Sequence, residues 1–391
     1  MRILVLTSLY PPHAYGGYER CCKDVVDRFV DRGHDVLVLT SDDRVPATST
    51  EPEVPGVERT LPMAWGLRRP PAPWRRPALR RRAQRALAAS IARQRPEVVS
   101  VWNMAGLPSP LLRAIPDIGQ VWIFADAWPE RALLGDPWLA PAAHHPGVAR
   151  FAGWPTMLPD LGQRGTLCFC SADLRDRIAA STGWSLDRAT VTPLGVDRRD
   201  FPAVGSPTGE KWSWRLLFVG RLDPGKGIDT LIRSLLRLPS AVRLTVVAPP
   251  EPTHLERVRA LIAGHELGDR VELTSMPRDR LAAVYRDADA CVFPSEWDEP
   301  FGIVPLEAMA CGTPVVATGV GGSGEYLRSD ENCVLFTPGD DASLASTLTA
   351  LAGDRALRNR VVAGGTRTAG RLTVDRLADQ LEGLHREAIR R

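Results

Sequence analysis

In residues 296–307, which read Glu-Trp-Asp-Glu-Pro-Phe-Gly-Ile-Val-Pro-Leu-Glu, the carboxylates of Glu299 and Glu307 flank an apolar run that contains Phe301 and Gly302. The apolar run before this segment, 290–293, is typical of a buried strand, and the run 303–311 is typical of a short helix closed by a glycine. Glu299 is therefore expected on a loop at the carboxyl end of a strand, and Glu307 on the helix that follows. In open α/β sheets this edge is where ligands bind.

This arrangement suits a sugar phosphate. Free backbone N–H groups at the helix start, near Phe301, Gly302 and Ile303, favour a phosphate. An ionised carboxylate such as that of Glu299 accepts several hydrogen bonds, which sugar hydroxyls donate. The alternative interpretation is a strand, loop and helix with ordinary surface acids.

Two cations lie on a second loop that is rich in glycine. An apolar strand is expected at 215–219, Arg221 follows it, and Lys226 stands between Gly225 and Gly227. A planar guanidinium fork together with a compact ammonium suits a diphosphate. The alternative is a solvated turn, although a chain with 49 basic residues places one of its few lysines here.

Composition limits the class of protein. A length of 391 residues predicts two domains, and 44 % hydrophobic residues are enough for packed cores. No apolar run is long enough to indicate a transmembrane helix, and Pro11 and Pro12 cut short the apolar N-terminus, which we interpret as a buried strand rather than a signal peptide. The seven cysteines lack the spacing of a zinc site or a disulfide framework, so we expect a cytoplasmic protein.

Strands and helices alternate along the chain, which predicts parallel sheets of the α/β class. The expected strands are 3–7, 36–40, 98–101, 121–124, 167–170, 216–219, 242–247, 271–273, 290–293, 314–317 and 334–336, and the expected helices are 19–32, 78–95, 228–238, 303–311 and 374–389. A change to Pro, Gly and polar residues near 192–197 predicts the domain boundary. We expect domains at 1–195 and 196–372, and a terminal helix at 373–391.

One region is strongly basic. Residues 68–95 contain no acid and ten arginines, namely Arg68, Arg69, Arg75, Arg76, Arg80, Arg81, Arg82, Arg85, Arg93 and Arg95, with Trp65 and Trp74 nearby. This charge favours an anionic partner, either a lipid surface at the inner membrane face or a phosphorylated acceptor. The alternative is a solvated helix face, because apolar residues recur at helical spacing in the same region. We expect no nucleic-acid partner, because no nucleic-acid-binding module is recognisable.

Together the motifs resemble the retaining glycosyltransferases of family 4, which have the GT-B fold. Glu299 and Glu307 match the Glu-x7-Glu signature of that family, and Arg221 and Lys226 match its diphosphate-binding pair. The resemblance extends to the N-terminal strand with its glycine loop and to the Gly-Gly-x-x-Glu loop at 321–325. It implies two Rossmann-like parallel-sheet domains that face a cleft, the first for the acceptor and the second for the nucleotide sugar, with the last helix crossing back to the first domain.

The resemblance also implies a reaction. A sugar would move, with retention, from a nucleotide-diphosphate sugar to a hydroxyl of a lipid, a glycan or a specialised metabolite. Arg221 and Lys226 would stabilise the leaving diphosphate in place of a metal ion, so no metal and no other cofactor are expected. Glu299 would orient the sugar, Glu307 would bind the ribose, and the base would lie near Met276.

The first domain should hold the acceptor. Gly16 and Gly17 would bring backbone N–H groups close to the donor phosphates, and Glu19 is expected to cap the next helix. The acceptor-side candidates are His13, Asn103, Asp126 and Trp128, and Asp126 is also a catalytic candidate. The alternatives are solvent exposure for the histidine and core packing for the tryptophan.

The chain departs from the family pattern at Ala125, where many relatives carry a histidine. This argues against a histidine-assisted scheme. A front-face mechanism, in which the leaving phosphate oxygen takes the acceptor proton, needs no protein base.

Three other functions are alternatives to sugar transfer. A nicotinamide dehydrogenase would need Gly-x-Gly-x-x-Gly after the first strand, and the loop here reads Pro-Pro-His-Ala-Tyr-Gly-Gly-Tyr-Glu. A sugar-nucleotide epimerase of the same fold and a non-catalytic nucleotide-sugar-binding protein stay open as alternatives. Lack of turnover without an acceptor would argue against an epimerase, and the retained charged motifs argue against loss of catalysis.

Overall fold

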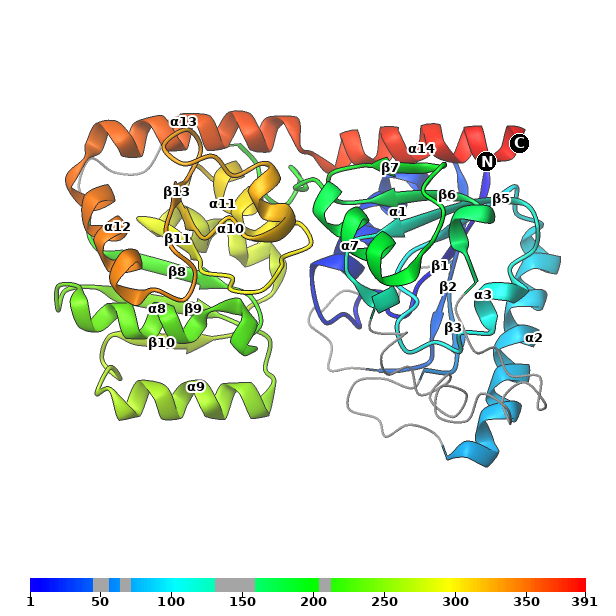
Figure 1. Ribbon diagram of the computed structural model, residues 1–391, viewed down its shortest axis with the longest axis horizontal. Helices are drawn as coiled ribbons and strands as arrows, with labels where there is room; N and C mark the ends of the chain where they lie inside the picture. The colour runs from blue at the N-terminus through cyan, green and yellow to red at the C-terminus, as the bar shows by residue number, and fades with distance from the viewer. Residues whose placement is uncertain (45–55, 64–71, 131–158, 204–211) are drawn as a thin grey trace. The chain divides into compact units, whose positions relative to one another are not determined.

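The computed structural model describes residues 1–44, 56–63, 72–130, 159–203 and 212–391 (Figure 1). The chain divides into two compact units, which are Met1–Pro193 with Leu377–Arg391 (unit 1) and Leu194–Arg376 (unit 2). The expected boundaries at 195/196 and 372/373 lie a few residues from these divisions.

Unit 1 is built on a seven-stranded parallel sheet with the order β3-β2-β1-β4-β5-β6-β7. Its strands are β1 (Arg2–Leu6), β2 (Asp35–Ser41), β3 (Val57–Leu61), β4 (Val98–Val101), β5 (Gly119–Phe124), β6 (Thr166–Phe169) and β7 (Ala189–Val191). Its helices are α1 (Gly17–Asp31), α2 (Arg76–Gln94), α3 (Leu111–Ala114) and α7 (Ala172–Thr182), with short 3-10 turns at Pro73–Arg75 and Leu161–Gln163. Strands β3 and β7, which the sequence did not predict, are the two edges of the sheet. They are only partly buried and therefore lack a continuous apolar run.

Unit 2 is built on a six-stranded parallel sheet with the order β10-β9-β8-β11-β12-β13. Its strands are β8 (Arg215–Val219), β9 (Arg243–Val247), β10 (Val271–Thr274), β11 (Ala290–Phe293), β12 (Val315–Ala317) and β13 (Val334–Leu335). Its helices are α8 (Ile228–Ser234), α9 (Pro252–Gly264), α10 (Arg278–Asp287), α11 (Ile303–Ala310), α12 (Asp341–Gly353) and α13 (Arg355–Arg371), with 3-10 turns at Pro224–Lys226, Leu235–Arg237 and Gly321–Glu325.

The helix expected at 228–238 is shorter than predicted. It ends at Ser234 and continues as the 3-10 turn Leu235–Arg237. Leu238 is extended, with φ −101° and ψ 157°, because it precedes Pro239 and a residue before proline avoids the helical region.

The central strands are largely apolar because helices cover both faces of a parallel sheet. Residues Ile3, Leu4, Val5 and Leu6 of β1 are fully buried, and β11 is buried along its whole length. The prediction of two Rossmann-like parallel-sheet domains is therefore confirmed. All seven cysteines are free and buried. Within the described residues, no helix combines the length and the apolar character that crossing a membrane requires.

The last helix, α14 (Val374–Arg390, red in Figure 1), belongs to unit 1 from Leu377 onward. Arg32 forms ion pairs of 2.7 Å with Asp379 and with Glu382 of α14. His34 Nε2 lies 3.0 Å from the same Glu382 carboxylate. These contacts fix the helix on unit 1 next to the N-terminus, whose amino group lies 3.2 Å from His34 Nδ1.

The strand order determines where ligands are expected. In each sheet the order reverses at one point, between β1 and β4 in unit 1 and between β8 and β11 in unit 2. Loops that follow the carboxyl ends of these strands diverge at that point and form the usual binding crevice of open α/β sheets. The site residues predicted from the sequence follow these strands or their neighbours, except Met276, which follows β10.

Candidate active site

The loop after β8 places Lys226 at the switch point of unit 2. The 3-10 turn Pro224–Lys226 ends at Gly227, whose φ of +69° is in the left-handed region. A Cβ on Gly227 would lie 1.8 Å from the carbonyl oxygen of Pro294, which follows the neighbouring strand β11. Glycine is therefore required for the loops after β8 and β11 to approach this closely.

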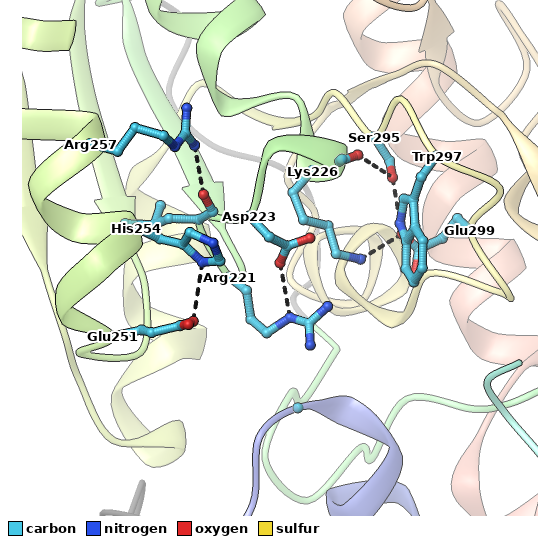
Figure 2. Close-up of polar contacts among 12 residues, drawn as sticks. Arg221, Asp223, Lys226, Glu251, His254, Arg257, Ser295, Trp297 and Glu299 are labelled. Carbon is cyan, nitrogen blue, oxygen red and sulfur yellow. Dashed lines mark hydrogen bonds and ion pairs between the residues drawn. The ribbon is translucent and has the colours of Figure 1, made fainter. Parts of the chain in front are cut away.

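The two loops meet in an ion pair between Lys226 and Glu299. Lys226 Nζ lies 2.6 Å from Glu299 Oε2, and both side chains are largely buried, with 16 % and 10 % of their surface exposed. The sequence motifs predicted that both residues would occupy this edge. The structure brings them into direct contact (Figure 2).

Two further donors reach the same oxygen of Glu299. Ser295 Oγ donates to Oε2 at 3.1 Å, and Trp297 Nε1 donates to it at 2.9 Å (Figure 2). Among the described residues no donor hydrogen-bonds Glu299 Oε1. The carboxylate is thus held by one oxygen, and its other oxygen has acceptor capacity left for a ligand hydroxyl.

Arg221 is not part of this contact in the free protein. Its Nε lies 3.1 Å from Asp223 Oδ2, and 42 % of its side chain is exposed. The base of the same loop is anchored from α9, because Arg257 contacts both carboxylate oxygens of Asp229 at 2.5 Å and donates to the carbonyl of Leu222 at 2.7 Å. Arg221 therefore extends from a fixed loop with its guanidinium open to solvent.

The start of α11 lies next to Glu299. Gly302 has a φ of +81°, and Tyr326 Oη donates to its carbonyl at 2.5 Å. Phe301 is buried and packs on the Tyr326 ring with centroids 5.0 Å apart. Phe301 and Gly302 thus shape the turn that precedes Ile303, where the backbone N–H groups of the helix begin.

Glu307 is held by a tyrosine that the sequence motifs did not reveal. Tyr285 Oη donates to Glu307 Oε2 at 2.8 Å, and both residues are buried. Burial, and next the charge of Glu307, raise the pKa of Tyr285 well above its usual value. Tyr285 therefore stays protonated and acts as a donor to the carboxylate.

The glycine loop after β12 supports Glu299 from its backbone side. Gly322 N donates to the carbonyl of Glu299 at 2.7 Å. A Cβ on Gly321 would lie 2.6 Å from the backbone N and O of Glu299, so this position also requires glycine. Met276, the residue predicted near the base, is half-buried in the loop after β10, at the same edge of the sheet.

The predicted residues of unit 1 follow β1, β4 and β5, which are neighbours in its sheet. Glu19 Oε2 accepts a hydrogen bond of 3.0 Å from Gly16 N, as expected for a helix cap. A Cβ on Gly16 would meet no atom within 4 Å, so the space beside it is open. Gly17 is exposed, and His13 is half-buried, with its backbone N–H donating to the carbonyl of Tyr10 at 3.1 Å.

The polar candidates after β4 and β5 bond to the backbone of their own loops. Asn103 Oδ1 accepts from Ala105 N at 2.9 Å, and Asp126 Oδ1 accepts from Trp128 N at 3.0 Å. Each bond spans two residues, as in an Asx turn. Trp128 is 2 % exposed and stacks on Phe124 at 5.9 Å, which favours core packing in the free protein. The roles of these residues toward an acceptor stay predictions.

Sequence reasoning missed three side chains that hold the two carboxylates, namely Ser295, Trp297 and Tyr285. Ser295 and Trp297 precede Glu299 by four and two residues, so their place beside the motif was a usable signal. Tyr285 is 22 residues from Glu307, and only the packing of α10 on α11 brings them together.

Comparisons with known proteins match both halves of the chain to glycosyltransferases. Residues 15–200 match the family model described as Glycosyltransferase Family 4, and residues 205–368 match the model described as Glycosyl transferases group 1. The chain is 37 % identical over 226 residues to a D-inositol 3-phosphate glycosyltransferase of Xylanimonas cellulosilytica, covering 54 % of each chain. It therefore spans about half the length of the curated relatives it matches.

Solved structures show the same fold. A sucrose-phosphate synthase from Thermosynechococcus elongatus superimposes with a TM-score of 0.75, at 22 % identity and 98 % coverage of each chain. The Anabaena protein HepE in complex with UDP-glucose superimposes with a TM-score of 0.70, at 19 % identity, covering 97 % of this chain and 98 % of that one. With its two family models, its charged motifs and its two Rossmann-like sheets, the chain belongs to the family 4 glycosyltransferases of GT-B fold.

Proposed function

We propose that the protein transfers a sugar from a nucleotide-diphosphate donor to a hydroxyl acceptor, with retention of the anomeric configuration. The observation that carries this proposal is the convergence of Lys226 and Glu299 at the switch point of unit 2, beside the start of α11. A cation and a carboxylate at this place suit the phosphate and the sugar of one ligand.

When the donor binds, its diphosphate replaces Glu299 as the ion-pair partner of Lys226. Lys226 and Arg221 then face the phosphates and stabilise the negative charge that grows on the leaving group. Glu299 accepts hydrogen bonds from the sugar, while Glu307, held by the protonated Tyr285, accepts them from the ribose. In the transfer step the bond from the anomeric carbon to the phosphate oxygen breaks, and a bond to the acceptor oxygen forms on the same face. The leaving phosphate oxygen takes the acceptor proton.

The two cations remove the need for a metal ion in this proposal. Arg221 and Lys226 together supply two positive charges at the diphosphate, as a bound divalent cation would. The protein is therefore proposed to work without a metal or other cofactor.

The names of similar proteins indicate which substrates to test first. UDP-glucose is bound by the HepE structure, so UDP-sugars head the list of donors. Inositol phosphate appears in the name of the sequence relative, so phosphorylated polyols join lipids, glycans and specialised metabolites as candidate acceptors.

The test begins with a thermal-shift screen of nucleotide sugars, followed by measurement of nucleotide release with a panel of acceptors. Release that requires an acceptor, with a product of the donor's anomeric configuration by NMR, supports the proposal. Interconversion of the donor sugar without an acceptor would identify an epimerase. Binding without turnover for any acceptor class would favour a nucleotide-sugar-binding protein.

We also propose that the basic region contacts an anionic membrane surface at the inner face of the cytoplasmic membrane. Trp74 is 79 % exposed, and the side chains of Arg75, just before α2, and of Arg81 and Arg85 within it are exposed as well. The buried face of α2 carries Ala83, Leu87 and Ser90 instead. Exposed arginines with a tryptophan suit the headgroup region of an anionic bilayer. Arg68 and Arg69, which were assigned to the same surface, and Trp65 lie outside the described residues.

Two exposed arginines of this region form ion pairs with acidic side chains in the described part of unit 1. Arg82 lies 2.8 Å from Asp42, and Arg93 pairs with Glu58. The test therefore replaces three other exposed arginines, Arg75, Arg81 and Arg85, by Gln. Binding to vesicles of anionic phospholipid should weaken, because each arginine contributes roughly 1 kcal/mol, and the effect should fade with salt. The control replaces Arg259, Arg280 and Arg376, which are exposed in unit 2, with the same loss of charge. Equal weakening in both triple variants, or a wild-type protein that ignores such vesicles at low salt, would contradict the proposal.

A further inference from the structure

Trp297 contacts both members of the ion pair at the switch point of unit 2. Its Nε1 donates to Glu299 Oε2 at 2.9 Å, and Lys226 Nζ lies 4.9 Å from the centroid of its indole ring (Figure 2). We propose that Trp297 is a positioning residue, which keeps Glu299 in place for the donor sugar and keeps Lys226 beside the donor diphosphate. This inference rests on the proposed transferase function and adds a residue to its site.

The position of Trp297 is fixed by its own backbone. The N–H groups of Glu296 and Trp297 both donate to the carbonyl of Gly225, at 2.8 and 3.3 Å. A Cβ on Gly225 would lie 3.2 Å from Cβ and 3.3 Å from Cγ of Trp297, so a side chain at position 225 would crowd the indole. Thr230 Oγ1, in the first turn of α8, donates to Glu296 Oε1 at 2.5 Å and ties that helix to the same loop.

The proposed binding step explains why Glu299 needs a hydrogen-bond donor besides Lys226. Lys226 is the charged partner of Glu299 in the free protein, and the donor diphosphate competes for the same ammonium. When Lys226 turns to the phosphates, Glu299 keeps only neutral donors, which are Ser295 and Trp297. The indole N–H therefore holds the carboxylate when the ion pair no longer does.

The contacts of Trp297 leave the other carboxylate oxygen available. Lys226, Ser295 and Trp297 all donate to Oε2, and within the described part of the chain Oε1 has no donor. A sugar hydroxyl that donates to Oε1 therefore meets an acceptor with a fixed direction. Loss of the indole N–H should disturb this direction more than it disturbs binding of the nucleotide.

The ring and the N–H have separate effects, which two variants distinguish. Trp297→Phe keeps an aromatic face for Lys226 and removes the donor to Glu299. We expect kcat to fall about tenfold, the effect of losing one hydrogen bond to a charged group, with the Kd of the nucleoside diphosphate unchanged within about twofold. Trp297→Leu removes both contacts, so kcat should fall as far and the diphosphate should bind more weakly as well.

Trp212→Phe is the matched control. Trp212 lies in unit 2 and packs on Trp214 with ring centroids 5.6 Å apart, and within the described residues its Nε1 makes no hydrogen bond. The same replacement there removes no hydrogen bond, so it should leave kcat and diphosphate binding unchanged. Thermal unfolding of all three variants separates a loss of stability from a loss of positioning.

A double-mutant cycle with Glu299→Ala tests whether Trp297 acts through the carboxylate. If it does, Trp297→Phe should cost almost nothing further in the Glu299→Ala background. Equal losses in both backgrounds, or a kcat of Trp297→Phe that matches that of Trp212→Phe, would overturn the inference. A wild-type protein that binds no nucleotide sugar would instead overturn the proposed function, so the two failures are distinguishable.

Discussion

The loops at the switch points of the two units use their polar side chains differently. In unit 2, Lys226, Ser295 and Trp297 all donate to the side chain of Glu299, so side chains from two loops bind one another. In unit 1, the side chains of Asn103 and Asp126 accept from backbone N–H groups two residues further on, each within a single loop.

This difference shows what each set of residues already does before a ligand arrives. An ion pair between side chains of two loops costs desolvation and gives the backbone little, which fits a site that serves a ligand. A side chain that caps its own loop stabilises the chain directly. The predictions below test this contrast, beginning with the largest expected effect.

Lys226→Ala should have the largest effect. Removing one group that stabilises charge in such a site costs about 2.7–4 kcal/mol of transition-state stabilisation, so kcat/KM should fall by two to three orders of magnitude. Because the side chain is mostly buried against Glu299, the free energy of unfolding should also fall, by roughly 1–3 kcal/mol. Nucleotide-release assays and denaturant unfolding measure the two effects. Near-normal turnover would mean that Lys226 does not bind the donor phosphates.

Acid should lower the free energy of unfolding of unit 1 through the protonation of His385 in α14. The ring is fully buried against Phe29, and burial, assisted by His34 and opposed by Glu382, lowers the pKa of His385 to about 3. The unfolded chain binds a proton at His385 below about pH 6.5, whereas the folded chain binds it only near pH 3. The free energy of unfolding therefore falls as the pH drops through this window. Between pH 7 and pH 5 the loss should approach about 2 kcal/mol.

His385→Phe removes this titration and keeps a ring next to Phe29. The shift of the urea midpoint between pH 7 and pH 5 should therefore be smaller in the variant than in the wild type. Glu382 adds a separate acid dependence, because hydrogen bonds from Arg32 and His34 outweigh its burial and lower its pKa, so its stabilisation disappears only at lower pH. An identical shift in variant and wild type would show that His385 is not the acid-sensitive group.

Asn103→Ala and Asp126→Ala should affect stability more than chemistry. Each removes one hydrogen bond to a loop N–H, which contributes about 1 kcal/mol, and kcat/KM should fall by about tenfold or less. For each variant, the loss in kcat/KM is divided by the loss in the free energy of unfolding. This ratio should be smaller than the ratio for Lys226→Ala. A loss of several hundredfold in either variant at unchanged stability would place that residue in the catalytic step and remove the contrast between the units.

Chelation should have the smallest effect. Because Arg221 and Lys226 supply the positive charge at the diphosphate, activity in excess EDTA should stay within about twofold of the untreated protein. Dependence of turnover on added magnesium or manganese would require a different arrangement of charge.

Much of this arrangement followed from the sequence. The apolar runs of β1, β8 and β11 located the central strands, and parallel topology then placed the loops that carry Arg221 and Glu299 at one edge. The partly polar edge strands β3 and β7 gave no such run and were missed. Helix α8 ends at Ser234, four residues before the predicted end, and Leu238 is extended before Pro239.

The contacts inside the site were beyond the sequence. The ion pair of Lys226 with Glu299 joins residues 73 positions apart, and the bond from Tyr285 to Glu307 joins two helices, so both depend on packing. Aspartate is common both among catalytic acids and in Asx turns. Only the structure shows that Asp126 forms such a turn.

Binding of a nucleoside diphosphate and of its monophosphate, titrated by calorimetry in EDTA, tests the central claim most directly. The base is the one selected by the thermal-shift screen, and the proteins are the wild type and Lys226→Ala. If Lys226 holds the terminal phosphate, the wild type should prefer the diphosphate by at least about tenfold, and the variant should lose most of this preference. A preference that persists undiminished in Lys226→Ala would contradict the assignment of this loop to the donor diphosphate.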